Sequence, residues 1–304
     1  MVKTLLGVIH RLKNTTADIR RVISMSIYER RRYLLLNKQI ERSYLTSYIY
    51  QKLLKFNYFQ NDLIFDISAN LYYNKETDIG YSLFYWGKFE EKEIQIFNNM
   101  LQSKSKPVIL DIGANIGCHC IRWAKSNPTA LLYAFEPSPS TRDILERNIK
   151  NNKVGNNIKA LPFAVSNQTG KASFYNCIDN AYSSLKDTKR KIVEKVIDVD
   201  MITIDKFVEN FKVGKIDLIK IDVEGFENEV IEGGVNSLRK FKPDLFVEIY
   251  QGTNSNEKPE KTIEVLLELG YNAYVLNDGK IEKYSYHSDS YYNYYFTFEN
   301  TCTT

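Results

Sequence analysis

Short apolar runs alternate with amphipathic segments along the larger part of the chain. The runs that have the length of buried strands are residues 107–113, 130–137, 157–165, 217–223 and 243–250. Apolar residues recur at the helical period in the segments between and after them, at residues 116–126, 138–152, 225–241 and 260–270. Alternating strands and helices of this kind predict a mostly parallel sheet with helices on both faces.

The flanking segments extend this α/β pattern in both directions. A strand at 63–74, an irregular aromatic segment at 80–86 and a helix at 89–101 are expected before the first run. Further strands are expected at residues 170–175, 194–204, 272–278 and 294–300. No internal repeat or low-complexity linker divides these elements, so residues 61–304 are interpreted as one α/β domain.

Residues 1–60 have a different character. They hold twelve Lys and Arg but three Asp and Glu, a net charge of about +9 in a chain whose total is +4. Residues 26–56 place apolar side chains near the helical period without Gly or Pro, which predicts a basic helical extension. Its basic face is interpreted either as solvated surface or as an arm that contacts an anionic membrane or a partner helix. No nucleic acid is expected, because aromatic side chains do not interleave with base-reading residues.

Cysteine content and hydropathy bear on the cellular compartment. Four cysteines at irregular spacing are too few for a disulfide framework, which favours a reducing environment. No apolar run approaches the roughly 20 residues that a membrane-spanning helix needs. The sequence therefore predicts a soluble cytoplasmic protein, with peripheral membrane contact through residues 1–60 as an open alternative.

The first apolar run ends in a carboxylate and two glycines, in the stretch VILDIGANIG at residues 108–117. Gly113 permits a tight turn after the strand, and Gly117 lets the next helix begin close to the sheet and to a ligand. The stretch lacks the G-x-G-x-x-G triplet of dinucleotide sites and the Gly-Lys-Ser/Thr of a phosphate loop. Because Asp111 would repel a pyrophosphate, this strand end favours a phosphate-free ligand that carries an ammonium group and hydroxyls.

A second carboxylate ends the next apolar run. Glu136 is followed by Pro137, which stops the strand, and an acid at this place typically binds both hydroxyls of a ribose. Acids at two adjacent strand ends, with glycines between them, indicate a pocket for a nucleoside joined to an amino acid, as in S-adenosylmethionine. The alternative is that Asp111 and Glu136 are a capping residue and a loop residue at ordinary turns.

The chain resembles the FkbM-type family of S-adenosylmethionine-dependent methyltransferases over roughly residues 71–250. The resemblance rests on the motifs LDIGANIG (110–117), AFEPSP (134–139), NIKNN (148–152), AVSNQTG (164–170), IKIDVEGFENEVIEGG (219–234) and PDLFVEIY (243–250). The most specific evidence for the resemblance is the combination of IDVEG (221–225) with the glycine-containing motif at 110–117. Residues 1–60 lie outside the resemblance.

The resemblance implies a Rossmann-like class I methyltransferase domain over residues 61–304, with a mostly parallel seven-stranded sheet. It further implies that S-adenosylmethionine is bound by Asp111, Gly113, Asn115, Gly117, Glu136 and Ala164. In this assignment the first four residues form the cofactor loop, Glu136 holds the ribose and Ala164 flanks the adenine. His119 and the cysteines on either side of it depart from the aromatic or small residues that are usual in the family.

Acids also gather at the ends of two later runs and are candidates for the chemistry of methyl transfer. Asp222 and Glu224 share one face of a strand end, and Glu248 ends the neighbouring strand. They are interpreted as a general base for the acceptor hydroxyl or as oxygen ligands for magnesium or calcium. The alternative is that these acids are hydrogen-bonded and only shape the loops that follow their strands. Asp222 is the preferred base or metal ligand, and Lys220, on the same face, is placed to pair with it.

Other features near the glycine loop are given structural roles. His119 is expected to pack against or cap its helix rather than act as a base. Cys118 and Cys120 lack further ligands nearby, so zinc is not expected. The polar segment 180–187 is interpreted either as a lid over the active site or as an ordinary surface loop.

The acceptor is inferred from the residues just after the fourth strand of the parallel series. Methyltransferases that modify DNA bases typically carry an Asn/Asp-Pro-Pro-aromatic turn there, whereas this chain has Asp-Val-Glu-Gly at 222–225. The resemblance implies an O-methyltransferase acting on a hydroxyl of a saccharide or secondary metabolite. The preferred acceptor is a sugar of a polysaccharide, glycolipid or lipid-linked glycan. Two alternatives remain: a nicotinamide-dependent sugar oxidoreductase, and a catalytically silent scaffold that binds the cofactor or a partner.

Overall fold

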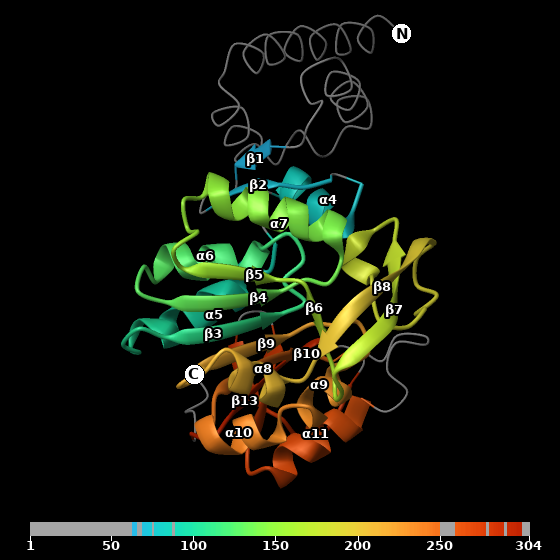
Figure 1. Ribbon diagram of the computed structural model, residues 1–304. Helices are drawn as coiled ribbons and strands as arrows, with labels where there is room; N and C mark the ends of the chain where they lie inside the picture. The colour runs from blue at the N-terminus through green and yellow to red at the C-terminus, as the bar shows by residue number, and fades with distance from the viewer. Residues whose placement is uncertain are drawn as a thin grey trace, which may run out of the picture.

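A computed structural model shows how the chain folds (Figure 1). It describes residues 63–65, 69–74, 76–86, 89–249, 259–277, 280–288 and 291–299. The basic helical extension expected at residues 1–60 lies outside these ranges, and so does the expected start of the domain at residue 61. Within the ranges, no helix is both long enough and apolar enough to span a membrane.

The centre of the fold is a sheet of eight strands among the described residues, in the order β12-β11-β13-β10-β9-β3-β4-β5. The parallel strands are β3 (Val108–Ile112), β4 (Leu131–Phe135), β5 (Ile158–Leu161), β9 (Leu218–Ile221) and β10 (Asp244–Glu248). Antiparallel strands complete one edge: β11 (Asn272–Asn277), β12 (Lys280–Lys283) and β13 (Asn293–Thr297). The predicted α/β architecture is confirmed. The expectation of seven strands is one short, because the mostly polar residues 280–283 form an edge strand that no apolar run marks.

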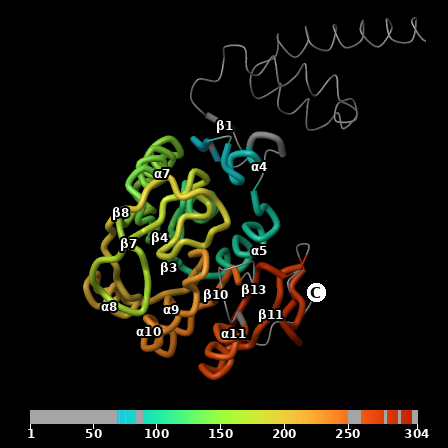
Figure 2. The backbone as a smooth tube through the Cα atoms, turned by 90° about the vertical axis from the view of Figure 1, so that its right-hand side faces the viewer, coloured from blue at the N-terminus to red at the C-terminus, as the bar shows by residue number. Residues whose placement is uncertain are grey.

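Helices cover both faces of this sheet (Figures 1 and 2). One face packs against α5 (Glu91–Gln102), α6 (Cys118–Ser126) and α7 (Pro139–Asn151). The other packs against α8 (Ile204–Asn210), α9 (Glu227–Glu232), α10 (Val235–Phe241) and α11 (Pro259–Glu268). Successive strand residues alternate between these two cores, so Ile109 joins the first and Leu110 the second. The same alternation decides where polar side chains at the strand ends point.

A separate three-stranded sheet lies beside the main one, with β6 (Phe163–Val165), β8 (Val193–Ile202) and β7 (Gly170–Cys177) in that order. The single strand expected at residues 157–165 is therefore wrong. It divides at Pro162, which has no N–H group to continue the ladder of β5. The division places Ala164 in the smaller sheet, where β6 pairs in parallel with β8.

The helix expected at residues 225–241 is also divided. It forms α9 and α10, which are separated by Gly233 and Gly234. A Cβ atom on Gly233 would lie 2.2 Å from the carbonyl oxygen of Ser166. The break is therefore the point where another part of the backbone packs against the helix.

Three other segments differ from expectation in smaller ways. The aromatic segment expected to be irregular at 80–86 is helical, as part of α4 (Asp78–Trp86). Residues 63–74 contain a pair of short antiparallel strands, β1 (Leu63–Phe65) and β2 (Asn70–Tyr72), rather than one strand. The strand expected at 194–204 ends at Ile202, because Thr203 caps α8 by accepting the N–H of Lys206 at 3.0 Å.

Candidate active site

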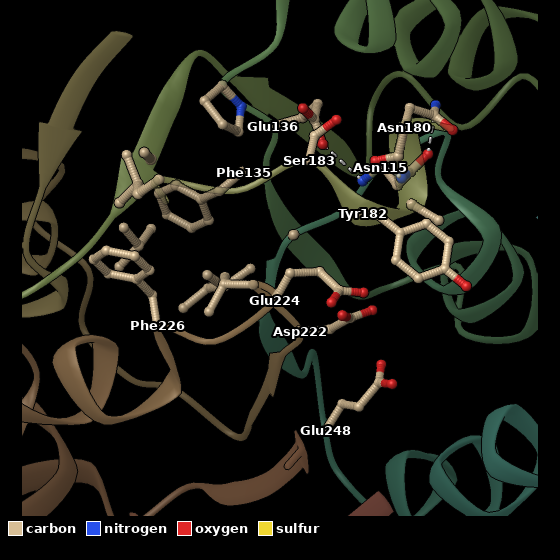
Figure 3. Close-up of a pocket in the computed structure, with 18 of the residues that line it drawn as sticks. Asn115, Phe135, Glu136, Asn180, Tyr182, Ser183, Asp222, Glu224, Phe226 and Glu248 are labelled. Carbon is tan, nitrogen blue, oxygen red and sulfur yellow. Dashed lines mark hydrogen bonds between the residues drawn. The ribbon is translucent and has the colours of Figure 1, made fainter. Parts of the chain in front are cut away.

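A cavity of about 230 Å³ lies beyond the carboxyl ends of the parallel strands (Figure 3). Its wall comes from the ends of β3, β4, β9 and β10, from β6, and from the segment between β7 and β8. Ligands of open α/β sheets bind at this edge, where the loops that follow the strands meet. Most of the site residues predicted from sequence line the cavity: Gly113, Asn115, Glu136, Ala164, Asp222, Glu224 and Glu248.

Asp111 lies beneath the cavity and pairs with a buried lysine. The register of β3 and β9 sets Asp111 beside Lys220, and the two residues are 0% and 3% exposed. Lys220 Nζ is 3.7 Å from Asp111 Oδ1 and 3.0 Å from Asp222 Oδ2. Asp111 is not one of the residues that line the cavity, so a direct contact between its carboxylate and a ligand stays a prediction.

This buried lysine controls the charge of Asp222. Burial raises the pKa of Asp222, but the charge and hydrogen bond of Lys220, together with a hydrogen bond from Glu248 and the charge of His119, lower that pKa below its ordinary value. Burial would lower the pKa of Lys220, and the carboxylates of Asp222 and Asp111 instead raise it well above its usual range. Lys220 also donates to the carbonyl oxygen of Gly113 at 3.4 Å. One cation therefore joins the glycine loop to the end of β9 and keeps Asp222 ionised.

The glycines of the loop permit close packing of the backbone. Gly113 has a φ of +81°, and a Cβ atom there would lie 1.8 Å from the carbonyl oxygen of Asp222. Gly117, with a φ of +92°, precedes α6, and a Cβ atom there would lie 2.7 Å from Leu145 Cδ1. Gly117 does not line the cavity. Its place is the contact between α6 and α7, so binding of a ligand by Gly117 stays a prediction.

Replacing Gly113 with alanine is expected to lower the free energy of unfolding by about 2–3 kcal/mol. The added methyl group meets a backbone oxygen, and an alanine at a positive φ adds strain. Urea denaturation measures the loss. Gly170→Ala is the control for the φ effect alone, because Gly170 has a φ of +140° and nothing within 4 Å of the added Cβ. A loss at Gly113 no larger than the loss at Gly170 would contradict this expectation.

Glu136, just after β4, has both carboxylate oxygens held by backbone N–H groups. Asn115 donates to Oε2 at 3.1 Å, and Ser138 donates to Oε1 at 3.0 Å. Burial raises the pKa of Glu136 to about 7, against the opposing effect of these N–H groups and of Arg142. The carboxyl group is therefore fixed in direction at one end of the cavity, and each oxygen keeps a lone pair for a hydroxyl donor.

Three acids, Asp222, Glu224 and Glu248, follow one another at the other end of the cavity (Figure 3). Burial and the charge of Asp222 raise the pKa of Glu224 to about 8, although Arg190 donates to its Oε2. Burial and the same neighbouring charge raise the pKa of Glu248 well above its ordinary value. The negative charge of the cluster is therefore favoured on Asp222, whereas Glu224 and Glu248 bind a proton more readily than an ordinary glutamate does.

The polar segment at residues 180–187 forms part of the cavity wall. Asn115 Nδ2 donates to the carbonyl oxygen of Asn180 at 3.2 Å, and Asn180 Nδ2 donates to Asn115 Oδ1 at 3.0 Å (Figure 3). Ser184 Oγ donates to the carbonyl oxygen of Glu224 at 2.9 Å. The segment thus connects the glycine loop to the acids at the end of β9, which places it at the site rather than on a remote surface.

Comparison with known proteins identifies the family. Residues 111–273, more than half of the 304-residue chain, match the sequence profile of the methyltransferase FkbM domain. The chain belongs to the FkbM methyltransferase family. The match begins at Asp111 and includes Glu136 and all three acids of the cluster, so the resemblance drawn from the motifs is confirmed.

Curated relatives of this FkbM domain are methyltransferases. The hexuronic acid methyltransferase AglP of Haloferax volcanii is 31% identical over 157 residues, which cover 51% of this chain and 61% of AglP. The methyltransferase sdnD of Sordaria araneosa is 29% identical, over 54% of this chain and 73% of sdnD. The 2-O-methyltransferase NoeI of Sinorhizobium fredii is 29% identical, over 46% of this chain and 62% of NoeI. The similarity thus spans less than two thirds of AglP and of NoeI.

Solved structures are more distant in sequence. An FkbM methyltransferase from Methylobacillus flagellatus aligns with a TM-score of 0.43 and 14% identity, over 63% of this chain and 44% of the other. An O-methyltransferase from Bacillus cereus in complex with SAH aligns with a TM-score of 0.43 and 14% identity, over 69% of this chain and 81% of the other. Similarity at this level locates no residue of the site.

Several residues at the cavity carry no signal in the sequence. Phe89 and Glu90 precede the FkbM match, and no motif marks them. Arg190 comes from the polar loop between β7 and β8, and its guanidinium lies 4.4 Å from the centre of the Tyr182 ring. Phe89 and Glu90 begin the helix expected at 89–101, and Arg190 lies in a polar loop, so neither place in the sequence indicates a contact with the acids.

His119 has the packing role expected from its place on α6. It is 4% exposed, and its ring lies against Phe89 and Trp123, with centroids 6.3 Å and 5.3 Å away. Its Nε2 atom is 2.9 Å from Glu90 Oε2. Cys118 and Cys120, beside it, are buried free thiols.

The magnesium or calcium site considered for the acids finds no support in this part of the molecule. In the described ranges, no three His, Cys, Asp or Glu side chains form a group suited to hold a metal ion. Asp222 and Glu224 instead contact cationic side chains of the protein, Lys220 and Arg190.

Proposed function

We propose that this chain is an S-adenosylmethionine-dependent O-methyltransferase that acts on a hydroxyl of a sugar. The observation that carries the proposal is a cavity with the oriented carboxyl group of Glu136 at one end and the ionised Asp222 at the other. The first end suits a ribose, and the second suits an acceptor hydroxyl. Membership of the FkbM family supports the same reaction.

The side chains that line the cavity suit the polar and apolar parts of the cofactor. Glu136 would accept the two ribose hydroxyls, because backbone N–H groups already fix its oxygens. Ala164, Val165 and Phe226 contribute apolar groups to the lining, against which the adenine would lie. Asp111 would act through Lys220, which it helps to hold in place. The proposed cofactor-binding residues are Asp111, Gly113, Asn115, Gly117, Glu136 and Ala164.

The acids at the far end are assigned to the removal of a proton. When bound, S-adenosylmethionine supplies an electrophilic methyl group together with its leaving group. The acceptor oxygen gains positive charge as it binds the methyl group, so its proton becomes strongly acidic and a weak base suffices. Asp222, which Lys220 keeps ionised, is proposed as that base. Glu224 and Glu248, in their protonated forms, would donate hydrogen bonds that orient Asp222 and the acceptor.

The nature of the acceptor is supported by the relatives and by the cavity. The names of AglP and NoeI refer to a hexuronic acid and to 2-O-methylation. Carboxyl groups in a confined site also suit the many hydroxyl donors of a sugar. A hydroxyl of a secondary metabolite is the alternative acceptor. A cytoplasmic location, with residues 1–60 at a membrane where lipid-linked glycans are assembled, stays a prediction.

Two other classes of function are less well supported. A nicotinamide-dependent oxidoreductase would need a cradle for a pyrophosphate, and the loop at 113–117 lacks the required glycine triplet. A catalytically silent scaffold would not need three acids with oppositely shifted pKa values at the end of its cavity. A binding measurement distinguishes the oxidoreductase from the proposed methyltransferase. A methyl-transfer assay distinguishes the silent scaffold from it.

S-adenosylhomocysteine is expected to bind the full chain in a calorimetric titration, and NADH is not. The affinity is expected to fall by up to tenfold for each pH unit below about 7. The pKa of Glu136 is raised to about 7, and only its ionised form accepts both hydroxyls, so binding is complete above that pH and requires loss of a proton below it.

Glu136→Gln is expected to weaken this binding at least tenfold at pH 8 and to remove the pH dependence. Glu146→Gln, which removes an exposed acid from α7, is the matched control and should leave both unchanged. No binding of S-adenosylhomocysteine to the parent chain, or binding of NADH in its place, would contradict the proposed function.

A further inference from the structure

We propose that Phe89 and Glu90 form the subsite that binds the acceptor sugar, with the aromatic ring against the sugar ring and the carboxylate on its hydroxyls. The inference rests on the proposed function and adds the residues that recognise the substrate. Both residues line the cavity. Both also precede residues 111–273, so the FkbM match assigns them no role.

The subsite lies at the acidic end of the cavity. Glu90 is close enough to Lys220 and Glu248 to influence the titration of both groups. His119, whose Nε2 lies beside Glu90 Oε2, contributes to the lowered pKa of Asp222. A hydroxyl bound by Glu90 would therefore lie at the same end of the cavity as the proposed base.

Two buried side chains of α6 fix the positions of Phe89 and Glu90. Arg122, which is 1% exposed, donates from Nη1 to the carbonyl oxygen of Phe89 at 2.9 Å. One turn earlier on the same helix, His119 Nε2 is 2.9 Å from Glu90 Oε2. Because α6 directly follows the loop at residues 113–117, Phe89 and Glu90 are fixed relative to the proposed cofactor-binding residues. A site preorganised in this way needs no reordering when a substrate binds.

Backbone strain distinguishes Glu90 from ordinary helix starts. Eight non-glycine residues in the described ranges have a positive φ. Five are exposed lysines outside helices and strands: Lys106, Lys153, Lys189, Lys212 and Lys242. The other three, Glu90, Asn115 and Glu224, all line the cavity. Glu90 thus shares, at a φ of 47°, a costly conformation with the glycine loop and the acid cluster, which are the functional parts of this site.

The chemistry of the pair matches a sugar better than an apolar or cationic ligand. A pyranose presents C–H groups on one face and hydroxyls around its edge, so it requires an apolar plane beside hydrogen-bond acceptors. Phe89 provides the plane. Glu90 Oε2 lies 2.9 Å from His119 Nε2, and Oε1 is assigned to a hydroxyl donor.

Saturation-transfer NMR with the full chain tests this subsite when S-adenosylhomocysteine is present at saturation. The probes are the methyl glycosides of glucose, galactose, mannose and glucuronic acid. At least one is expected to bind the parent chain. Glu90→Gln and Phe89→Ala are each expected to weaken that binding about tenfold to a hundredfold, while affinity for S-adenosylhomocysteine changes less than about twofold. Glu93→Gln, which removes an acid from the first turn of α5, is the matched control and should change neither.

Glu90→Gly separates recognition from a structural role. Glycine relieves the positive φ, so this variant is expected to melt no lower than Glu90→Gln while it loses sugar binding to the same extent. Sugar binding that survives in both Glu90 variants and in Phe89→Ala would overturn the proposal. Binding of S-adenosylhomocysteine without binding of any probe would also overturn it and leave the cofactor assignment intact. Failure of the parent to bind S-adenosylhomocysteine would instead contradict the proposed function, and this subsite with it.

Discussion

Lys220→Met is expected to lower the free energy of unfolding by about 3–5 kcal/mol at pH 7. The ammonium group is the cation that contacts both Asp111, which is 0% exposed, and Asp222. Its removal leaves a buried carboxylate without a compensating charge, and it also frees the carbonyl oxygen of Gly113. Denaturation by urea, followed by circular dichroism, measures the loss.

The pH dependence of this contribution follows from the direction of the two pKa shifts. Lys220 lowers the pKa of Asp222, so the stabilisation is present above the ordinary aspartate value of about 3.9 and disappears as the pH falls through the lowered value. The pKa of Lys220 is raised, so its contribution is complete below the ordinary lysine value of about 10.4 and is lost only at higher pH. The difference between parent and variant should therefore be nearly constant from about pH 5 to pH 9.

Lys215→Met is the matched control for Lys220→Met. Lys215 Nζ is 2.9 Å from Asp217 Oδ2, but its side chain is 45% exposed. A pair of this kind contributes about 0–1 kcal/mol, because water screens it and solvates either partner alone. Equal losses in the two variants would show that the Lys220 pair behaves like a surface pair and would contradict its assigned role in the site.

Asp222→Asn is expected to lower kcat for methyl transfer about a hundredfold to ten-thousandfold. Asparagine occupies the same space but cannot take the proton of the acceptor hydroxyl. Lys220 keeps its contact with Asp111 in this variant, so the fold and the cofactor end of the cavity should be retained. Transfer of a labelled methyl group from S-adenosylmethionine to the best sugar acceptor measures the rate. Calorimetry with S-adenosylhomocysteine should show an affinity within about threefold of the parent.

Glu248→Gln is the comparison that gives this result its meaning. Burial and the charge of Asp222 raise the pKa of Glu248 well above its ordinary value, which favours the protonated form of this side chain. Glutamine keeps a hydrogen-bond donor at that place, and the variant should lose less than about tenfold in kcat. A larger loss from Glu248→Gln than from Asp222→Asn would assign the base to Glu248 instead.

The central sheet could be predicted because its signals are local. Apolar runs such as 107–113 and 243–250 must be buried on both faces, and helices with one apolar side must lie between them. The errors have equally specific causes. Pro162 ended one ladder and sent Ala164 into a second sheet, while the glycines at 233 and 234 broke one helix in two. The helix break depends on where the backbone at Ser166 packs, and the strand break depends on the missing N–H group of a proline, and hydrophobic periodicity reports neither.

Part of the candidate site could also be predicted from the sequence. Strand-end acids, at Glu136, Asp222 and Glu248, reach the same edge of the sheet because parallel strands all end there. Glycines that need a positive φ, at 113 and 117, could be recognised from their spacing after a strand. These features require only the direction of the strands and the alternation of side chains along them.

Tertiary structure decided which of these residues face a ligand and which stabilise their neighbours. The sequence by itself determined the α/β order and the edge at which the acids gather, because both follow from the periodicity and length of each segment. Only folding placed Asp111 under the cavity beside Lys220, since that contact depends on the register between β3 and β9. Only folding brought Phe89 and Glu90 to the acids, through contacts with α6 that lie about thirty residues further along the chain. Charge pairing and burial are properties of distances between segments, and those distances exist only once the core has formed.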